Sequence, residues 1–492
     1  MTSPPPRSSL ARILLRGTVW TTLGSYAGQL LGFAAVLVLT RLLDQTTFGW
    51  LALATFWVSL LNLRTKAGLN YSAIRQPVTT GELLGSYYAL DLALGALSFT
   101  LSCVAAVLLP RLGYPRPVAL AVVALMGAES LVTLVSPLAI ALEKELQVSR
   151  LTLVTLVGYV AAYAVAIPLA LAGGGLWSLL AINLVAAVVS LGGVYVTCRQ
   201  RWPEAFRLRW RFDRDLARRL IREGLPTGLS YTALASIVNQ FDNFLIGTFV
   251  SAATLGLYDR AYRIASWPNL LATTIITRIG FLAFAKVRED PERLAQAVQL
   301  ALWGLAVISL PLALGLLFGA NDIIQVLYGD RWAESAPFLR FLSLYSLIWP
   351  VTSLGYWLAA AVGHHRTALG LTAAQAATII GLGVPLTLWL GVTGTLLAVA
   401  ATMLVACGLT NFYVFRQISL SPFAVYGRPG LAAAAALLAL WLAQRALAWS
   451  AWPAAVRLGV MGIIIVAVFG GLLFVLEGAA LRERLRYLVR LW

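Results

Sequence analysis

Long uninterrupted runs of apolar residues constrain this chain more than any other feature of its sequence. Crossing about 30 Å of hydrocarbon takes about 20 apolar residues in a helix, because no water is present there to satisfy the backbone. The 492-residue chain is 60% hydrophobic and only 12% charged, whereas a soluble chain carries about 25% charged residues. We therefore predict an all-α polytopic membrane protein with about fourteen spans. The runs lie at residues 17–40, 46–63, 83–109, 117–141, 151–172, 174–197, 224–250, 261–284, 296–319, 337–362, 367–388, 391–415, 425–447 and 454–477.

The positions of lysine and arginine test this division into spans. If the first segment lies in the cytoplasm, 27 of the 37 basic residues fall in inner segments and 9 in outer segments, with Arg278 inside a span. This bias follows the positive-inside rule. We therefore expect an uncleaved first span and both ends of the chain in the cytoplasm. The net charge of +17 is explained by these loops, so no nucleic-acid partner is expected.

A basic linker and an internal repeat predict two lobes. Nine arginines lie in the longest polar stretch, 199–223, and a shift of 207 residues places Gly17 on Gly224 and Gly49 on Gly256. Parallel repeats of this kind are a transporter architecture. We expect two parallel six-helix lobes related by pseudo-two-fold symmetry, followed by two C-terminal helices. The segments are a cytoplasmic N-terminus at 1–16, an N-lobe at 17–198, the linker at 199–223, a C-lobe at 224–415, spans 13 and 14 at 416–477, and a basic cytoplasmic tail at 478–492.

A short helix is predicted within the linker. Asp213 is expected to cap a short helix that runs through Leu216, Leu220 and Ile221. The arginines are interpreted as a solvated inner loop attracted to anionic lipid headgroups.

The sequence gives little support to a catalytic or metal-binding interpretation. Its three cysteines lie in separate apolar stretches, and it contains no Gly-x-x-x-x-Gly-Lys-Ser/Thr, His-Glu-x-x-His or Gly-x-Ser-x-Gly pattern. No P-loop nucleotide site, zinc protease site or hydrolase nucleophile is therefore indicated. We expect no cofactor, no metal and no catalytic residue. A polytopic glycosyltransferase or polymerase is an alternative, but no outer loop clearly exceeds about twenty residues.

Five segments of the chain resemble turns of a known family. They are Thr40-Arg41-Leu42-Leu43-Asp44 with Phe48-Gly49, Ala67-Gly68-Leu69-Asn70-Tyr71-Ser72-Ala73-Ile74-Arg75-Gln76, Asp242-Asn243-Phe244-Leu245-Ile246-Gly247, Leu255-Gly256-Leu257-Tyr258-Asp259-Arg260-Ala261-Tyr262-Arg263, and Tyr328-Gly329-Asp330-Arg331-Trp332 with Ala336-Pro337. These turns are similar to those of Wzx-like oligosaccharide flippases, the polysaccharide transporters of the multidrug/oligosaccharidyl-lipid/polysaccharide exporter superfamily. The resemblance covers about residues 10–420.

This resemblance implies a non-enzymatic flippase. Such a protein moves undecaprenyl-diphosphate-linked oligosaccharide from the inner to the outer leaflet by alternating access, for export of surface polysaccharide or exopolysaccharide. It implies a bacterial cytoplasmic (inner) membrane protein whose partners are the lipid-linked oligosaccharide, membrane phospholipid and a polymerase or export machinery. A cation-coupled multidrug exporter of the same superfamily is the other alternative. Those exporters typically place an acid in the first span, and residues 17–40 contain none.

Basic residues near the inner ends of two corresponding spans form the predicted binding site. Arg64, Lys66 and Arg75 lie at or just beyond the inner end of span 2, and Arg278 lies near the inner end of span 8. Charges at bilayer depth are costly and usually face a partner or a wet cavity. Arginine forks also match phosphate oxygens. We expect these four residues to bind the diphosphate; the alternative is that they are ordinary snorkelling cations at helix ends.

Acidic residues within the spans have several interpretations. Glu129, near the middle of span 4, is expected either to be protonatable and couple transport to a proton gradient or to pair with a cation or hydrogen-bond partner. Asp91 is expected to line the sugar path or to pair with an arginine. Asp242 is expected to form a structural ion pair with Arg263, because folding the chain back about the turn between spans 7 and 8 brings them close.

Overall fold

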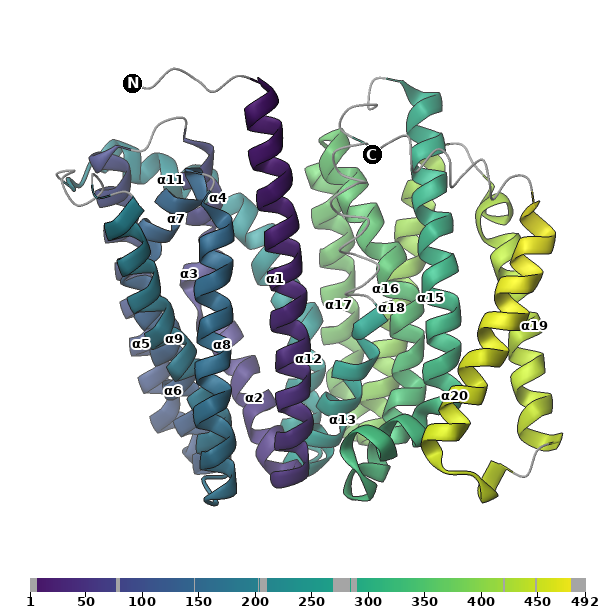
Figure 1. Cartoon of the computed structure of the whole chain (residues 1–492). Helices are drawn as coiled ribbons and strands as arrows, with labels where there is room; N and C mark the ends of the chain where they lie inside the picture. Colours follow the sequence, from purple (N-terminus) through teal and green to yellow (C-terminus); the bar gives the residue numbers. More distant parts are fainter. Residues whose placement is uncertain are drawn as a thin grey trace. The chain divides into compact units, whose positions relative to one another are not determined.

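The structure is a computed structural model in which residues 7–76, 80–145, 147–201, 203, 210–268, 284, 290–418, 421–446 and 449–478 are described. Every regular element in these ranges is a helix, so the all-α prediction is confirmed. The chain divides into two compact units, Met1–Leu255 and Gly256–Trp492. We call them unit 1 and unit 2 and describe each by itself; their helices are labelled in Figure 1.

Unit 1 contains the elements up to residue 255. They are α1 (Arg7–Leu42), α2 (Gln45–Leu61), α3 (Leu63–Lys66), α4 (Leu69–Arg75), α5 (Gly81–Arg111), α6 (Arg116–Thr133), α7 (Ser136–Lys144), α8 (Val148–Leu171), α9 (Leu176–Arg201), α11 (Arg214–Gly228), the π-helix η1 (Leu229–Ala233) and α12 (Leu234–Phe249). α13 (Ala252–Ala265) crosses the division between the units.

Unit 2 contains the remaining elements. They are α15 (Pro291–Tyr328), the 3-10 helix η2 (Asp330–Ser335), α16 (Ala336–Val362), α17 (His365–Leu390), α18 (Val392–Ile418), α19 (Pro422–Ala446), the 3-10 helix η3 (Trp449–Ala451), α20 (Ala454–Ile465) and the π-helix η4 (Val466–Gly470).

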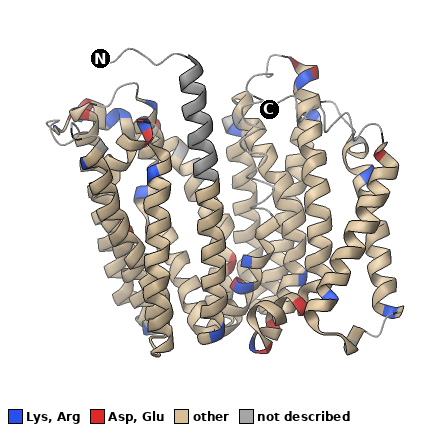
Figure 2. Ribbon diagram, viewed as in Figure 1, with Lys and Arg blue, Asp and Glu red and all other residues tan. Residues whose placement is uncertain are grey.

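The described helices match a membrane protein in length and composition. Ten of them are long and apolar enough to cross a bilayer, and the charged residues lie mostly near helix ends (Figure 2). Two predicted spans correspond to shorter helices, since α2 has 17 residues and α12 has 16. The number of fourteen spans, the pseudo-symmetry and the predicted lobe boundaries stay predictions.

The predicted span 4 is not one straight helix. Its run is divided between α6 and α7, because Val135 leaves the helical conformation before Ser136 and Pro137 begin the second helix. Proline lacks a backbone N–H and fits the first turn of a helix far better than its interior. Span 2 ends similarly, at Asn62, where α2 stops and the short α3 begins.

The helix predicted in the linker is present. Asp213 caps α11 by accepting hydrogen bonds from the backbone N–H groups of Asp215 at 2.8 Å and Leu216 at 3.1 Å. Leu220 is fully buried in a cluster with Leu69, Leu83 and Ile140 of α7. The helix therefore packs one face on α4, α5 and α7 and turns its arginines outward, as an amphipathic helix does.

Glycines allow α11 to pack this closely in unit 1. A Cβ at Gly228 would lie 2.1 Å from the carbonyl oxygen of Lys66, and one at Gly224 would lie 2.8 Å from that of Ala67. These distances are shorter than van der Waals contact, so only glycine fits. Gly68, which opens α4 with a φ of 63°, needs the left-handed conformation that glycine adopts without strain.

Two apolar clusters form the core of unit 2. One joins α15 to α16, with Val298, Leu302 and Leu354 buried at its centre. The other joins α15 to α19, α20 and η4, and it contains Trp303 and Ala436. The helices predicted as spans 13 and 14 therefore pack on α15 in the second of these clusters.

A buried ion cluster lies on α13 in unit 2. The Asp259 carboxylate pairs with Arg260 and, at 3.2 Å, with Arg263 Nε. Burial alone would raise the pKa of Asp259, but the charges of Arg263 and Arg260 outweigh it and hold that pKa below its usual value. Tyr328 donates a hydrogen bond to the Arg260 carbonyl at 3.5 Å, so α15 is tied to this cluster.

Candidate functional site

The site is built around Arg64, which a helix interruption places away from the regular path of α2. Asn62 ends α2 and then caps α3, accepting a hydrogen bond from the Thr65 N–H at 3.3 Å. The Leu63 N–H, freed by the same break, donates to Ser98 Oγ on α5 at 2.9 Å. The interruption thus has its backbone groups satisfied, as a break at bilayer depth requires.

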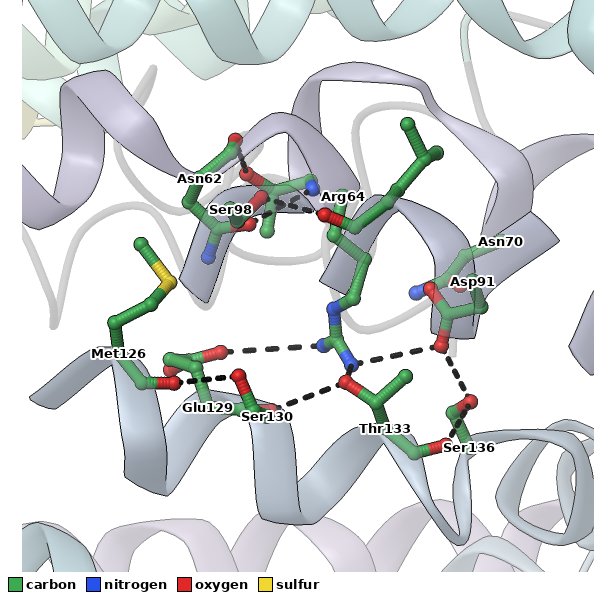
Figure 3. Close-up of polar contacts among 12 residues, drawn as sticks. Asn62, Arg64, Asn70, Asp91, Ser98, Met126, Glu129, Ser130, Thr133 and Ser136 are labelled. Carbon is green, nitrogen blue, oxygen red and sulfur yellow. Dashed lines mark hydrogen bonds and ion pairs between the residues drawn. The ribbon is translucent and has the colours of Figure 1, made fainter. Parts of the chain in front are cut away.

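The Arg64 guanidinium lies between two carboxylates that come from different helices (Figure 3). Arg64 Nη1 is 3.6 Å from Asp91 Oδ2 on α5. Arg64 Nη2 is 3.9 Å from Glu129 Oε2 on α6. The structure therefore brings together three of the residues that the sequence singled out, from segments far apart in the chain. For Asp91 and Glu129 it shows pairing with a cation, which was one of their predicted alternatives.

Hydroxyl groups at the α6–α7 break complete this cluster. Arg64 Nη1 donates to Thr133 Oγ1 at 3.2 Å. Ser136 Oγ contacts Asp91 Oδ2 at 2.5 Å and the Thr133 carbonyl at 2.9 Å. Figure 3 shows the guanidinium facing the α6–α7 break, with Thr133 between the two acids. Two helix interruptions therefore meet at one charged site.

The two acids hold Arg64 differently. The Asp91 side chain is 2% exposed and fixed by Ser136, whereas the Glu129 side chain is 48% exposed. Both ion-pair distances exceed the 2.7–2.9 Å of a tight charge-assisted hydrogen bond. Glu129 is therefore the exposed and more loosely held partner of Arg64, and Asp91 is the buried and fixed one.

Arg64 keeps donor capacity for a ligand. A guanidinium has five N–H donors, and among the described residues Arg64 makes one side-chain hydrogen bond, to Thr133. Its side chain is 15% exposed. A partly accessible guanidinium with unused donors can bind a phosphate or carboxylate in bidentate geometry.

Of the other predicted basic residues, the structure describes Lys66 and Arg75. Lys66 donates to the Leu60 carbonyl and so caps the end of α2. Arg75 is exposed in the last turn of α4. Arg278 lies outside the described residues. Their joint role in diphosphate binding stays a prediction.

The predicted pair of Asp242 and Arg263 also stays a prediction. Asp242 is buried on α12 in unit 1, where it accepts a hydrogen bond from the Asn243 N–H at 2.8 Å. Arg263 has Asp259 as a partner within α13, an acid that the sequence analysis did not single out.

Thr133, Ser136 and Asn62 are functional candidates that sequence reasoning missed. For Thr133 and Ser136 the signal is the Ser136-Pro137 pair, since proline within an apolar run marks a helix boundary. The apolar run of residues 117–141 conceals this boundary, because its length alone predicts one continuous span.

Comparison with known proteins assigns the chain to a family. The family model described as "Polysaccharide biosynthesis protein" matches residues 38–337, more than half of the chain. The chain belongs to this family. The resemblance drawn from the turn motifs is therefore confirmed, and the matched range contains the whole Arg64 cluster.

Two proteins of similar sequence have names from polysaccharide biosynthesis. The succinoglycan biosynthesis transport protein ExoT of Rhizobium meliloti (strain 1021) is 27% identical over 342 residues, which are 68% of this chain and 66% of ExoT. The lipopolysaccharide biosynthesis protein WzxC of Escherichia coli (strain K12) is 23% identical over 367 residues, 69% of this chain and 68% of WzxC. The match thus spans just under two thirds of ExoT.

Two solved structures share the fold of this chain. The lipid II flippase MurJ, in an inward closed conformation, has a TM-score of 0.72 at 12% identity and covers 93% of this chain and 99% of its own. An inward-facing multidrug resistance MATE family transporter of the MOP superfamily has a TM-score of 0.65 at 16% identity, covering 80% of this chain and 95% of its own. These likenesses show a shared fold.

Proposed function

We propose that this chain is a flippase that moves an undecaprenyl-diphosphate-linked oligosaccharide across the bacterial cytoplasmic membrane for polysaccharide export, without catalysing a reaction. Three findings support the proposal: membership of the polysaccharide biosynthesis family, a relative named as a succinoglycan biosynthesis transport protein, and a fold shared with a lipid II flippase. The observation that carries it is the Arg64 guanidinium, placed at two helix breaks with unused donors.

The diphosphate binds at Arg64 by replacing Glu129. Its oxygens take the edge of the guanidinium that now faces Glu129, 3.9 Å away, while Asp91 and Thr133 keep the other edge in place. Arg64 thereby exchanges its long ion pair with Glu129 for a bidentate contact in which two N–H groups bind two phosphate oxygens. Lys66, Arg75 and Arg278 add positive charge on the approach from the cytoplasmic side.

We also propose Glu129 as the residue that couples transport to an ion gradient. One guanidinium faces two carboxylates, and Glu129, the more exposed of the two, is the acid that the diphosphate frees.

The experiment is translocation in liposomes. The purified chain is reconstituted with a fluorescent lipid-diphosphate oligosaccharide in the inner leaflet, and its appearance in the outer leaflet is followed. Wild-type protein is expected to transfer it. Arg64→Ala is expected to lower the initial rate about tenfold or more, the loss of one charge-assisted contact, and Arg64→Lys is expected to be intermediate because an ammonium lacks the fork.

A matched control removes an arginine away from this cluster. Arg111 is exposed in the last turn of α5, and Arg111→Ala is expected to transfer at the wild-type rate. Equal rates for Arg64→Ala and Arg111→Ala would exclude Arg64 as the diphosphate site. Transport of cationic drugs without transfer of the lipid would favour the multidrug exporter alternative instead.

A further inference from the structure

Unit 2 contains a polar cavity that the proposed function leaves unexplained. Its volume is about 540 Å³, within the range of small-ligand sites. It lies where the end of α15 and the start of α16 meet the connection from α19 to α20, and these segments share one end of the unit 2 helices in Figure 1. That end is the predicted outer side. The polar lining residues are Asn321, Asp322, Gln325, Arg340, Gln444 and Arg457, with the indole of Trp449 beside them.

Contacts within the chain hold two of the lining side chains, those of Arg457 and Trp449. Arg457 Nη2 pairs with Asp322 Oδ1 at 2.5 Å, and Arg457 Nη1 donates to the Trp449 carbonyl at 3.3 Å. The Trp449 indole N–H donates to the Ala443 carbonyl and is therefore held by α19. This arrangement fixes an aromatic wall and a guanidinium without any ligand, which lowers the ordering cost of binding.

Several polar groups in the cavity are uncommitted. The side chains of Asn321, Arg340 and Gln444 make no hydrogen bond or ion pair with any other described residue, and Arg457 Nε is buried without a partner there. A buried donor without a partner costs free energy. Gln325 donates to Asp330 at 3.0 Å, and its carbonyl oxygen is left to accept. The cavity thus offers both donors and acceptors.

The charge of the cavity selects for an anion. Arg457 is balanced by Asp322, whereas Arg340 is exposed at the start of α16 with no acid paired to it among the described residues. The lining therefore has one net positive charge. A free guanidinium favours a carboxylate or phosphate, the amides suit hydroxyl groups, and the indole offers an apolar wall with a polar tip.

We infer that this cavity binds an acidic sugar residue of the transported glycan on the outer side of the membrane. The carboxylate pairs with Arg340, the hydroxyl groups meet Asn321, Gln325 and Gln444, and one face of the sugar ring lies on Trp449. The site holds the glycan after translocation and before the next partner takes it. The inference rests on the proposed function for the identity of its ligand, and its test is separate.

The test measures binding to the purified full chain in detergent by titration calorimetry. Three probes are compared: a glucuronate-containing disaccharide, a neutral glucose disaccharide of the same size, and glycerol phosphate as the headgroup of an anionic lipid. We expect the acidic disaccharide to bind about tenfold more tightly than the neutral one, the effect of one charge-assisted hydrogen bond. Glycerol phosphate is expected to bind more weakly than the acidic disaccharide, since it lacks a sugar ring.

Two neighbouring variants separate the site from general charge. Arg340→Gln is expected to remove the preference for the acidic disaccharide and leave the affinity for the neutral one unchanged. Arg445→Gln removes a guanidinium next to Gln444 that does not line the cavity and lies over the Trp441 ring at 4.0 Å. That variant is expected to bind all three probes as the wild type does.

The outcomes distinguish this inference from the proposed function. Equal affinity for both disaccharides, or an unchanged preference in Arg340→Gln, overturns the acidic-sugar site. Tightest binding of glycerol phosphate shows an anionic-lipid site and also overturns it. If the chain binds the acidic disaccharide but fails to move lipid-linked oligosaccharide in liposomes, the proposed function is wrong and the site stands. If it moves the lipid but binds no acidic sugar, only this inference is wrong.

Discussion

Removing Arg64 should have two separable effects, one on stability and one on transport. Arg64→Ala takes away a cationic partner of Asp91, whose side chain is 2% exposed. Breaking a buried pair by deleting one partner costs about 3–5 kcal/mol. We expect about 3 kcal/mol, the lower end of that range, because the pair is 3.6 Å apart and Ser136 still contacts Asp91.

A second substitution should restore the stability without restoring transport. In the double variant Arg64→Ala/Asp91→Asn no uncompensated charge is left at position 91, and the new amide oxygen can accept from Ser136 Oγ. We expect its unfolding free energy to lie within about 1 kcal/mol of the wild type. Its transport rate should stay as low as that of Arg64→Ala, because the group that binds the diphosphate is still missing.

Thermal unfolding in detergent and translocation in liposomes measure the two effects. A loss of about 3 kcal/mol corresponds to about 3–6 °C in melting temperature, at about 1–2 °C per kcal/mol for a chain of this size. Arg111→Ala is the control in both assays. A wild-type melting temperature for Arg64→Ala would refute the buried pair. A wild-type transport rate in the double variant would show that Arg64 only balances the charge of Asp91.

Other predictions test the packing of each unit. Gly228→Ala should destabilise the contact of α11 with α3 by about 1–3 kcal/mol, because its Cβ would lie 2.1 Å from the Lys66 carbonyl oxygen. Limited proteolysis near residues 210–213 should then become faster. Gly304→Ala is the control, because a Cβ there has no neighbour within 4 Å, and it should leave the rate of proteolysis unchanged. Asp259→Asn should destabilise unit 2 by about 3 kcal/mol at neutral pH. The pKa of Asp259 is lowered in the folded chain, so its contribution to stability is present above the unfolded value of 3.8 and is lost as pH falls through the folded pKa. The unfolding curves of the variant and the wild type should therefore approach each other as pH falls from 3.8 and converge below the folded pKa. A difference that is independent of pH would contradict the charge role of Asp259.

The all-helical class and the helix in the basic linker, α11, could both be predicted from the sequence. Apolar runs of membrane length have few structural solutions, so an all-α membrane protein followed directly. The cap at Asp213 and the burial of Leu220 also followed, because both depend on residues within a few positions of each other. The turn motifs identified the family, whose match covers residues 38–337.

The charged site could be predicted only in part. Arg64, Asp91 and Glu129 were each selected as costly charges in apolar runs, but their meeting depends on which helices are neighbours, and hydropathy does not contain that information. The breaks at Asn62 and Ser136 depend on local capping that a long apolar run conceals. The cavity beside Arg457 was missed for the same reason, since its residues come from four separate helices and one short turn.

The most direct test of the central claim is the affinity of the purified chain for lipids that differ only in their phosphate group. An undecaprenyl diphosphate oligosaccharide and the same oligosaccharide on an undecaprenyl monophosphate are titrated into wild-type protein and Arg64→Ala. The account predicts tighter binding of the diphosphate by the wild type, and loss of that preference in Arg64→Ala with both proteins folded. Equal affinity of the wild type for the two lipids, or an unchanged preference in Arg64→Ala, would contradict it.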